Sequence, residues 1–302
     1  MRIVYERAAV RVPATTANMG PGFDSFGMAF RYYDEVSVRP ITGTTRVIVE
    51  GVGAETVPTD DDNLVVQALR AGLDAVGAPQ AGFEMRCVNR IPHGGGMGSS
   101  ASAAVAGLML ARGLISEPEA LSDDRIFALA TDFEGHPDNV APAVFGGATV
   151  AWVERGGHPR MAPMPVDTSL GVSLLIPPAT TRLSTKEARQ VLPVSVPRED
   201  ALFNTSRAAV LMLALAGRPD LLMAGTEDRL HQEYRRGVLP ASMAVMDSLR
   251  AQGYPAVISG AGPTVLVLAD MAPQMRLALE RHGWTVLSPG IDLAGARLLP
   301  AD

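Results

Sequence analysis

The sequence predicts a mixed α+β protein of two domains. Its 302 residues are 47% hydrophobic and 19% charged, enough to bury two cores of ordinary size. Strand-like and helix-like patterns alternate in both halves, and a Gly- and Pro-rich segment at 156–165 reads as a connector between them. We therefore expect two α/β-type sandwiches, with domains spanning 1–160 and 161–302.

The elements follow from the spacing of apolar residues along the chain. The first half predicts strands near residues 2–12, 45–52, 83–90 and 147–153, and helices near 63–76, 100–115 and 123–134. The second half predicts strands near 171–176, 256–260, 264–269 and 284–288, and helices near 200–216, 240–252 and 272–282. The single cysteine, Cys87, falls in a strand pattern, so we expect a buried structural thiol.

Charge and composition narrow the classes of ligand. The formal net charge of −6 argues against a nucleic-acid partner, which needs clustered basic residues. Neither a signal peptide nor a membrane span is indicated, so we expect a cytoplasmic protein with small-molecule ligands. Lys186 is the one lysine of the sequence, so a phosphate site would have to use backbone amides and arginine.

A glycine-rich run at 94–98, followed by two serines and an Ala-rich helix, is the most informative segment. Glycines let backbone N–H groups approach an anion closely, and a helix N-terminus offers unpaired N–H donors and partial positive charge. Either serine could cap the helix, and a hydroxyl there could also bind Mg²⁺. The plainer alternative is a flexible turn with Ser99 as the N-cap. A Walker A loop is excluded because the segment has no lysine.

Two further segments carry polar groups on turns. In residues 12–27, Asn18 and Asp24 could together accept an ammonium group and a hydroxyl, or could simply close Asx turns. Residues 258–264 contain Gly260 and Gly262 and would by themselves be a turn between two strands.

Taken in order, these segments resemble the motifs of the GHMP kinases, which phosphorylate galactose, homoserine, mevalonate and phosphomevalonate. Residues 92–100 resemble P-x-x-x-G-L-G-S-S, with Met97 in place of leucine. Residues 12–27 resemble the form of the first motif found in the homoserine branch. Residues 260–264 resemble the third motif, with Thr264 where that branch often has serine.

The resemblance covers nearly the whole chain and implies both a fold and an activity. The implied fold is the two-domain GHMP kinase fold, with an N-terminal domain like domain 2 of ribosomal protein S5 and a C-terminal ferredoxin-like domain. The implied activity is transfer of the γ-phosphoryl group of ATP to L-homoserine, a step of threonine biosynthesis, with Mg²⁺ as cofactor and a homodimer as assembly. Alternatives are another GHMP small-molecule kinase or a non-catalytic ligand sensor on the same fold.

The resemblance also implies the nucleotide site. Residues 62–64 resemble a D-N-L element whose asparagine meets the adenine, although Asn63 could instead be only an N-cap. The expected ATP-binding residues are Asn63, Pro92, His93, Gly94, Gly95, Gly96, Met97, Gly98, Ser99, Ser100, Ala101, Ser102, Gly260 and Gly262.

Glu134 is the predicted metal ligand. It ends the helix near 123–134, where the helix dipole disfavours a carboxylate unless a cation compensates it. By resemblance, Glu134 and either Ser99 or Ser100 would hold Mg²⁺ beside the phosphates. The alternative is an ordinary solvated glutamate at a helix end.

The remaining predicted residues concern the amino-acid substrate. Mevalonate-type relatives have an aspartate at the position of Asn139, and an amide cannot act as a base. The resemblance therefore implies that Asn139 orients the attacking hydroxyl, beside His136 and Asp138 as substrate-binding residues. Matches to S-T-x-x-A-R-x-x-L-P and H-x-x-Y-R imply that Arg189 and Arg235 bind the substrate carboxylate. Arg182 and Arg236 lie close enough in sequence to be alternatives to them.

Overall fold

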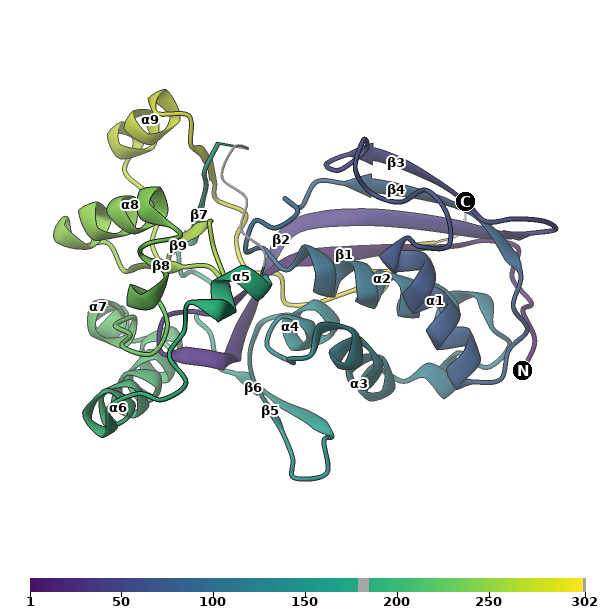
Figure 1. The fold of residues 1–302 in the computed structure, drawn as a ribbon, viewed down its shortest axis with the longest axis horizontal. Helices are drawn as coiled ribbons and strands as arrows, with labels where there is room; N and C mark the ends of the chain where they lie inside the picture. Colours follow the sequence, from purple (N-terminus) through teal and green to yellow (C-terminus); the bar gives the residue numbers. More distant parts are fainter. Residues whose placement is uncertain (179–184, 301–302) are drawn as a thin grey trace.

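The first half of the chain folds around one large sheet with helices on one face (Figure 1). The computed structural model describes residues 1–178 and 185–300. Within them this sheet has seven strands in the order β11-β1-β2-β4-β3, with β5 paired to β2 and β6 to β5. Its strands are β1 (Ala8–Asn18), β2 (Gly22–Ile41), β3 (Arg46–Gly51), β4 (Gly82–Asn89), β5 (Ala148–Val153), β6 (Pro159–Met164) and β11 (Arg297–Leu298).

The helices that cover this sheet form the first hydrophobic core with it. They are α1 (Leu64–Ala75), α2 (Ser99–Leu114), η1 (Pro118–Leu121), α3 (Asp123–Glu134) and α4 (Val140–Phe145). The Ala-rich helix α2 is the central one, since it packs against α1, α3 and β1. The packing between α2 and α1 is tight at Gly107 of α2, because a Cβ there would lie 2.3 Å from the carbonyl oxygen of Val65 in α1. Small residues thus let α2 pack closely against α1.

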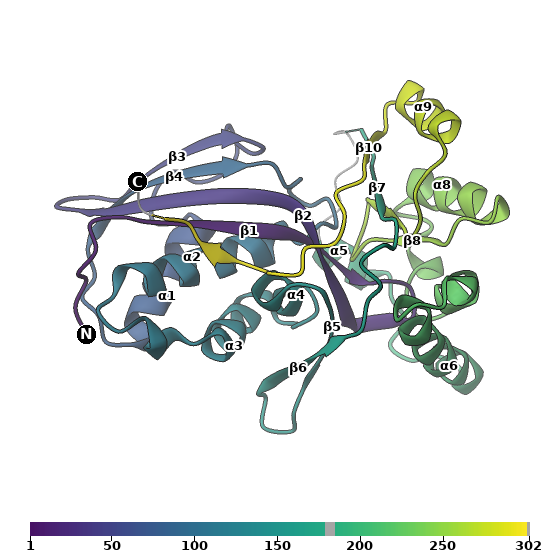
Figure 2. The same cartoon turned by 180° about the vertical axis from the view of Figure 1, so that it is seen from behind.

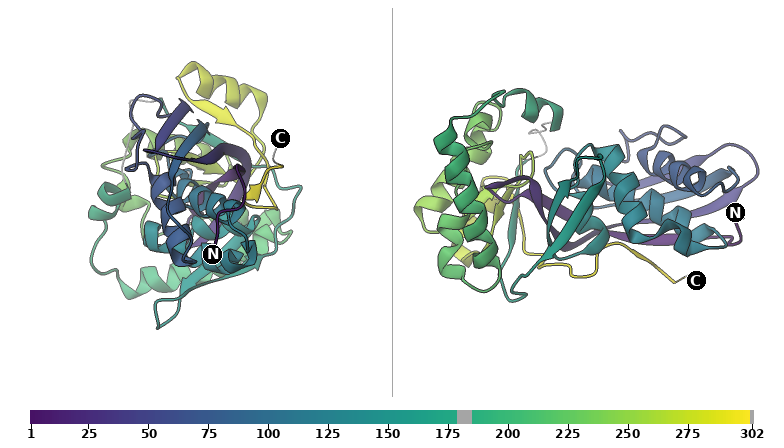
Figure 3. Two further views of the ribbon diagram at one scale, coloured as in Figure 1. Left: turned by 90° about the vertical axis from the view of Figure 1, so that its right-hand side faces the viewer. Right: turned by 90° about the horizontal axis from the view of Figure 1, so that it is seen from below.

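The second half contains a separate antiparallel sheet. It is formed by β7 (Ser173–Ile176), β8 (Ala256–Ile258), β9 (Val265–Val267) and β10 (Thr285–Leu287), in the order β10-β7-β9-β8. The chain order strand, helices, strand, strand, helix, strand with this pairing is the ferredoxin-like topology. Its helices are α5 (Thr185–Gln190), α6 (Arg198–Leu215), η2 (Pro219–Leu221), α7 (Leu222–Gly225), η3 (Glu233–Arg235), α8 (Pro240–Ala251) and α9 (Pro273–Arg281). The two halves lie end to end along the long axis of the molecule (Figures 2 and 3).

The sequence-based expectations hold for most elements and fail for two segments. The predicted two-domain α+β fold is confirmed, and the predicted Cys87 thiol is buried in β4. The connector predicted at 156–165 is wrong, because β5 and β6 form a hairpin there that projects from the molecule (Figure 1). Pro159 and Pro163 are tolerated in β6 because it is an edge strand, paired only with β5. The domain limits at 160 and 161 stay a prediction.

The long strand β2 is the second difference. Residues 12–27 were expected to form a stiffened turn after a strand, but β1 continues to Asn18 and β2 starts already at Gly22. The turn is therefore only three residues long, and a register shift between Ala17 and Asn18 marks where the two strands bend into it. This bend carries the first predicted motif out of the large sheet and toward the second half of the chain (Figure 2).

Candidate active site

Backbone hydrogen bonds join the three predicted glycine motifs into one structure. The amide of Thr15 donates to the carbonyl of Met97 at 3.1 Å, and the amide of Gly260 donates to that of Ala17 at 3.1 Å. The Ser259 hydroxyl donates to the carbonyl of Gly96 at 2.6 Å. Segments that lie far apart in sequence are thereby fixed around a single cavity.

That cavity has a volume of about 160 Å³ and collects most of the predicted site residues. The predicted residues that line it are Asn18, Asp24, Gly94, Gly95, Gly96, Gly98, Ser99, Ser100, Glu134, His136, Asp138, Asn139, Arg189, Arg235, Gly260 and Gly262. A second, more apolar cavity of about 230 Å³ adjoins it and shares Ser99 and Ser100 with it. The predicted residues Pro92, Met97 and Ala101 line neither cavity.

The start of α2 is built to leave backbone donors available. Gly98 is the N-cap residue in the left-handed conformation, with φ of 69°, and no side chain accepts a hydrogen bond from the first turn. The expectation that a serine caps this helix is therefore not met. Because Gly98 has no side chain to offer, the amides of the first turn and the positive end of the helix dipole face the cavity.

Ser100 and Glu134 meet across this cavity. The Ser100 hydroxyl donates a hydrogen bond to the Glu134 carboxylate, and α3 ends at Glu134 as expected, with Gly135 following in the left-handed conformation. Burial raises the pKa of Glu134, and the hydrogen bond from Ser100 offsets this only in part. This half-buried carboxylate is thus costly to keep charged without a nearby cation.

These oxygen donors fit Mg²⁺ bound together with a phosphate. Serine hydroxyl and glutamate carboxylate are hard oxygen ligands, and Mg²⁺ in proteins often takes one or two such groups plus phosphates and water. Among residues 1–178 and 185–300, no group of three or more His, Cys, Asp or Glu side chains could hold a metal ion. Ser100 and Glu134 are two oxygen ligands of the kind that Mg²⁺ takes in proteins.

The second cavity is lined by Asn63, whose amide is already engaged. Its carbonyl oxygen accepts from the amide of Val65 at 2.9 Å, which makes Asn63 the N-cap of α1, and its NH₂ donates to the carbonyl of Pro58 at 2.8 Å. The N-cap alternative is thus realised in the structure. The adenine contact stays a prediction, as does the role of His93 and Ser102 in the same cavity.

Asn139 and Asp138 are held by hydrogen bonds that fix their orientation. The Thr15 hydroxyl donates to the side-chain oxygen of Asn139 at 2.8 Å, which leaves the NH₂ group of Asn139 available at the cavity. Asp138 accepts from the amide of Asn139 at 2.8 Å and lies 2.5 Å from Nδ1 of His136. Burial disfavours the charged imidazole, but Asp138 outweighs it and raises the pKa of His136.

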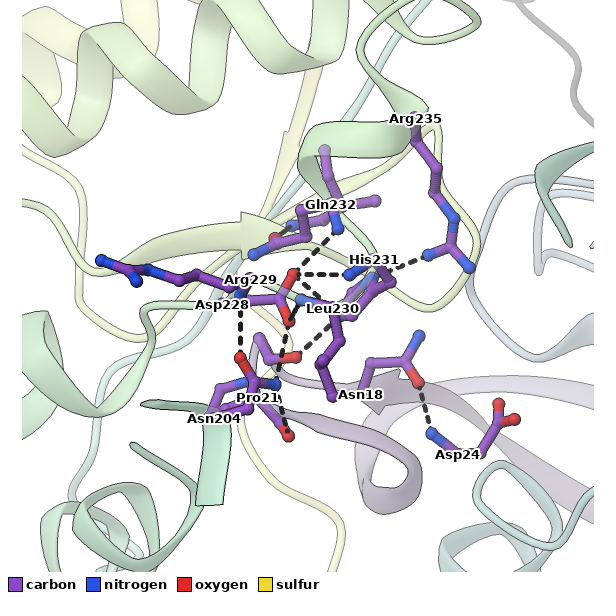
Figure 4. Close-up of polar contacts among 12 residues, drawn as sticks. Asn18, Pro21, Asp24, Asn204, Asp228, Arg229, Leu230, His231, Gln232 and Arg235 are labelled. Atoms are coloured by element: carbon purple, nitrogen blue, oxygen red, sulfur yellow. Dashed lines mark hydrogen bonds and ion pairs between the residues drawn. The ribbon is translucent and has the colours of Figure 1, made fainter. Parts of the chain in front are cut away.

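Asn18 and Asp24 hold strained backbone conformations at the bend between β1 and β2. Both have positive φ, 69° and 54°, which is costly for residues other than glycine. The side-chain oxygen of Asn18 accepts from the amide of Asp24 at 3.0 Å (Figure 4). The NH₂ group of Asn18 donates to the carbonyl of Gly260 at 2.9 Å. The strain therefore turns the Asp24 carboxylate toward the cavity, where Arg189 pairs with it.

Of the two adjacent arginines, Arg235 is buried and Arg236 lies on the surface. Arg235 is 2% exposed, while Arg236 forms exposed ion pairs with Glu233 and Asp247. Burial and the nearby charge of Arg189 lower the pKa of Arg235 to about 10, so it remains cationic at neutral pH. Within residues 1–178 and 185–300, Arg235 forms no ion pair with a carboxylate. Arg182 lies outside the described residues.

Known proteins are similar to this chain over nearly its full length. The model of the GHMP kinase N-terminal domain matches residues 63–147, and that of the GHMP kinase C-terminal domain matches residues 211–283. Homoserine kinase from Clavibacter michiganensis is 47% identical over 304 residues, covering 98% of this chain and 95% of that protein. Homoserine kinase from Streptomyces avermitilis is 47% identical over 293 residues, covering 96% and 95%. The chain belongs to the homoserine kinase family of GHMP kinases.

Solved structures agree with this family's fold. The structure of homoserine kinase from Cytophaga hutchinsonii matches with a TM-score of 0.85 at 24% identity, covering 98% of each chain. A structure of L. major mevalonate kinase with R-mevalonate matches with a TM-score of 0.67 at 17% identity, covering 92% of this chain and 95% of that one. The GHMP kinase fold expected from the motifs is confirmed.

Three residues of this GHMP kinase site were not singled out from the sequence. Thr15 orients Asn139, Phe23 lines the main cavity, and His231 contacts Arg235. Each lies inside a segment that matches a family motif, within four residues of an expected site residue. Nothing in the sequence pairs Thr15 with Asn139, because the two lie 124 residues apart, and the contact of His231 with Gly20 likewise joins distant segments.

Proposed function

We propose that this GHMP kinase transfers the γ-phosphoryl group of ATP to the side-chain hydroxyl of L-homoserine, giving O-phospho-L-homoserine and ADP. One observation carries the proposal. A single cavity contains the open helix start at Ser99 on one side and, on another, the buried guanidinium of Arg235, which has no carboxylate partner among the residues that the structure describes. An anion-binding amide cradle and an anion-binding arginine in one small cavity suit a reaction between a nucleotide and a carboxylate-bearing acceptor.

The nucleotide would span both cavities. Their shared residues, Ser99 and Ser100, lie at the start of α2, so phosphates at this helix end would have the base in the apolar cavity near Asn63. The amides of the first turn would bind the phosphate oxygens, because no side chain caps that turn. This placement accounts for a phosphate site without lysine.

Ser100 and Glu134 would hold Mg²⁺ at the phosphates. When bound, the ion neutralises charge that develops on the phosphoryl oxygens. The protein's part is to orient the two oxygen ligands, and the hydrogen bond between Ser100 and Glu134 already places them side by side. Ser100, rather than Ser99, is therefore our choice of serine ligand.

The amino acid would lie between Asp24, Arg189 and Arg235. Its α-carboxylate would bind the two guanidinium groups. Its α-ammonium would bind Asp24 and Asn18. His136 and Asp138 would line the neighbouring wall of the cavity. The four-carbon substrate then has its hydroxyl directed toward Asn139. The free NH₂ group of Asn139 would orient the hydroxyl oxygen, since Thr15 occupies the other end of the amide.

Positioning and charge neutralisation would provide the catalysis. The hydroxyl oxygen forms a bond to the γ-phosphorus while the bond to the bridging oxygen of ADP breaks, and the hydroxyl proton is released. The loose transition state of phosphoryl transfer places little demand on a general base. The absence of an acid at position 139 is compatible with this mechanism.

An ADP-release assay tests the proposal. We expect turnover with ATP, Mg²⁺ and L-homoserine, and far weaker turnover with L-serine, which has a shorter side chain, or with mevalonate, which has no ammonium group for Asp24. Turnover with mevalonate instead would make the chain another GHMP small-molecule kinase. Binding of homoserine without any ADP release would make it a ligand sensor. Either result would overturn the proposal.

Two broader expectations accompany this function. The described residues contain no helix that is long and apolar enough to span a bilayer. Location in the cytoplasm and assembly as a homodimer are proposals that rest on the family. Light scattering coupled to size-exclusion chromatography would measure the second directly.

A further inference from the structure

His231 is a fully buried histidine that lies between Arg235 and Gly20, a residue of the first motif. It is 0% exposed, and its two ring nitrogens contact different partners (Figure 4). Nδ1 lies 2.9 Å from Nη1 of Arg235, and Nε2 lies 2.7 Å from the carbonyl oxygen of Gly20. A guanidinium can only donate and a carbonyl can only accept, so Nδ1 must carry the lone pair and Nε2 the proton.

The surroundings of His231 favour this neutral form. Burial lowers the pKa of His231, and the charge of Arg235 acts in the same direction, against the opposing charges of Asp228 and Asp24. The ring of Phe23 stacks on the imidazole, with ring centroids 5.0 Å apart and an angle of 20° between the planes. Protonation would place an N–H of the imidazole against an N–H of the guanidinium.

A network of backbone contacts fixes the position of His231. The carboxylate of Asp228 accepts from the amides of Leu230, His231 and Gln232, at 2.9, 3.1 and 2.8 Å. Asn204 of α6 donates to Asp228 at 3.1 Å and accepts from the amide of Arg229 at 2.8 Å (Figure 4). The loop that carries His231 is therefore held in one conformation by buried polar groups.

These contacts leave Nη2 of Arg235 available at the main cavity. Its Nε donates to the carbonyl of Ala188 at 3.2 Å, and Nη1 also donates to that of Gly260 at 3.1 Å. Within the described residues, Nη2 of Arg235 has no hydrogen-bond partner, and the side chain lines the main cavity. An arginine side chain has many rotamers, and the contact with His231 selects among them.

We infer that His231 is a positioning residue for substrate recognition: its neutral imidazole holds Nη1 of Arg235 so that Nη2 meets the carboxylate of the amino acid. The contact of His231 with Gly20 connects Arg235 to the bend that carries Asp24. The groups that bind the carboxylate and the ammonium of the substrate are therefore held in a fixed position relative to each other. The inference rests on the proposed function, in which Arg235 binds that carboxylate.

Two variants separate the two contacts of His231. The side-chain oxygen of asparagine can replace Nδ1 as acceptor, and the side-chain NH₂ of glutamine can replace Nε2 as donor. We expect His231→Gln to raise the KM for L-homoserine by about tenfold or more, with kcat and the KM for ATP changed far less, because a misplaced ligand contact weakens substrate binding. We expect His231→Asn to recover most of that loss. The exposed His282, replaced in His282→Asn, is the matched control and should leave both KM values unchanged.

A substrate lacking the carboxylate shows whether the effect goes through Arg235. We expect 3-aminopropan-1-ol, which is homoserine without its carboxylate, to be a poor substrate whose kcat/KM is the same for wild type and His231→Gln. A purely structural role would reduce kcat/KM for both acceptors alike. Equal KM values for homoserine in the asparagine and glutamine variants would also refute the inference.

The wild-type protein offers a test that does not depend on a variant's folding. In a long-range ¹H–¹⁵N spectrum of protein labelled at histidine, His231 should show a protonated Nε2 and an unprotonated Nδ1 at neutral pH. A doubly protonated ring would overturn the inference. If wild type fails to phosphorylate homoserine while His231 shows this tautomer, the proposed function fails and the arrangement around Arg235 survives as the site of another anion.

Discussion

The guanidinium of Arg189 donates two hydrogen bonds to the carboxylate of Asp24, at 3.0 and 2.7 Å, across the candidate active site. This half-exposed pair offers one positive and one negative group, which are the charges that would bind the carboxylate and the ammonium of an amino acid. An incoming substrate would therefore exchange partners with this pair: its carboxylate would take Arg189 and its ammonium would take Asp24.

Replacing Asp24 tests the exchange. We expect Asp24→Asn to raise the KM for L-homoserine by about tenfold or more, because the ammonium loses a charge-assisted hydrogen bond. Asp220 is a matched control, since it forms a similar two-pronged pair with Arg218 on the surface. Asp220→Asn should leave the KM unchanged, and an equal effect of both variants would speak against the proposed ammonium site.

The neighbouring arginines, one the last residue of η3 and the other its C-cap, allow a comparison between two adjacent positions. We expect Arg235→Leu to raise the KM for homoserine by about 100-fold, the cost of losing a buried charged partner of a carboxylate. Arg236→Leu should change it little, because Arg236 pairs with Glu233 and Asp247 on the surface. Steady-state kinetics with varied homoserine measures both. An unchanged KM in Arg235→Leu would show that the carboxylate binds elsewhere.

Gly98 should not tolerate even one added methyl group. A Cβ at Gly98 would lie 1.9 Å from the Thr15 hydroxyl oxygen, which would break the hydrogen bond that orients Asn139. We expect Gly98→Ala to lower kcat by about 100-fold, because misplaced catalytic groups are that costly. Gly77 has a similar φ of +62° with nothing within 4 Å of a Cβ, so Gly77→Ala should cost only about 1 kcal/mol of backbone strain and leave kcat unchanged. Similar kcat values for the two variants would contradict this.

The two serines at the start of α2 should differ. The hydroxyl of Ser100 contacts Glu134, whereas Ser99 lines the cavities as the first residue of the helix. We expect Ser100→Ala to lower kcat and to increase the Mg²⁺ concentration needed for half-maximal activity by about tenfold, the scale of a lost metal contact. Ser99→Ala should shift that midpoint less. A reversed order would assign the metal to Ser99.

Glu134 should make the ligand-free protein less stable as pH rises. Burial raises its folded-state pKa, so between the unfolded and folded values the folded state binds more protons, and the free energy of unfolding falls with increasing pH. The destabilisation begins near the ordinary glutamate pKa and is complete above the raised one. We expect Glu134→Gln to raise Tm at neutral pH, to leave it unchanged at low pH, and to reduce activity. A lower Tm for this variant at neutral pH would contradict the assigned cause.

Local chemistry explains what could be predicted from the sequence. The glycine-rich run and the helix after it are recognisable because their residue types and spacing are dictated by nearby backbone, whereas Asp138 and Asn139 were expected only from the resemblance to the GHMP kinases. The helix 123–134 was expected with its true limits, since Ser122 and Gly135 mark its ends.

Contacts between distant segments explain what could not be predicted. The strand β2 begins with glycine-rich sequence that reads as a turn, and its length depends on pairing with β1, β4 and β5. The contact of His231 with Gly20 joins residues that lie 211 positions apart, so no sequence spacing predicts it. Only the folded structure shows which of two adjacent arginines is buried.

The short strand β11 gives the protein a particular order of assembly. Leu298 pairs with Val10 of β1, so the last described strand completes the sheet of the first half. During synthesis on the ribosome, this edge of β1 lacks its neighbour until residues 297–298 have been made. A nascent chain stalled after β10 would present the edge of β1 to its surroundings, where chaperones could bind it, and synthesis through β11 would cover it.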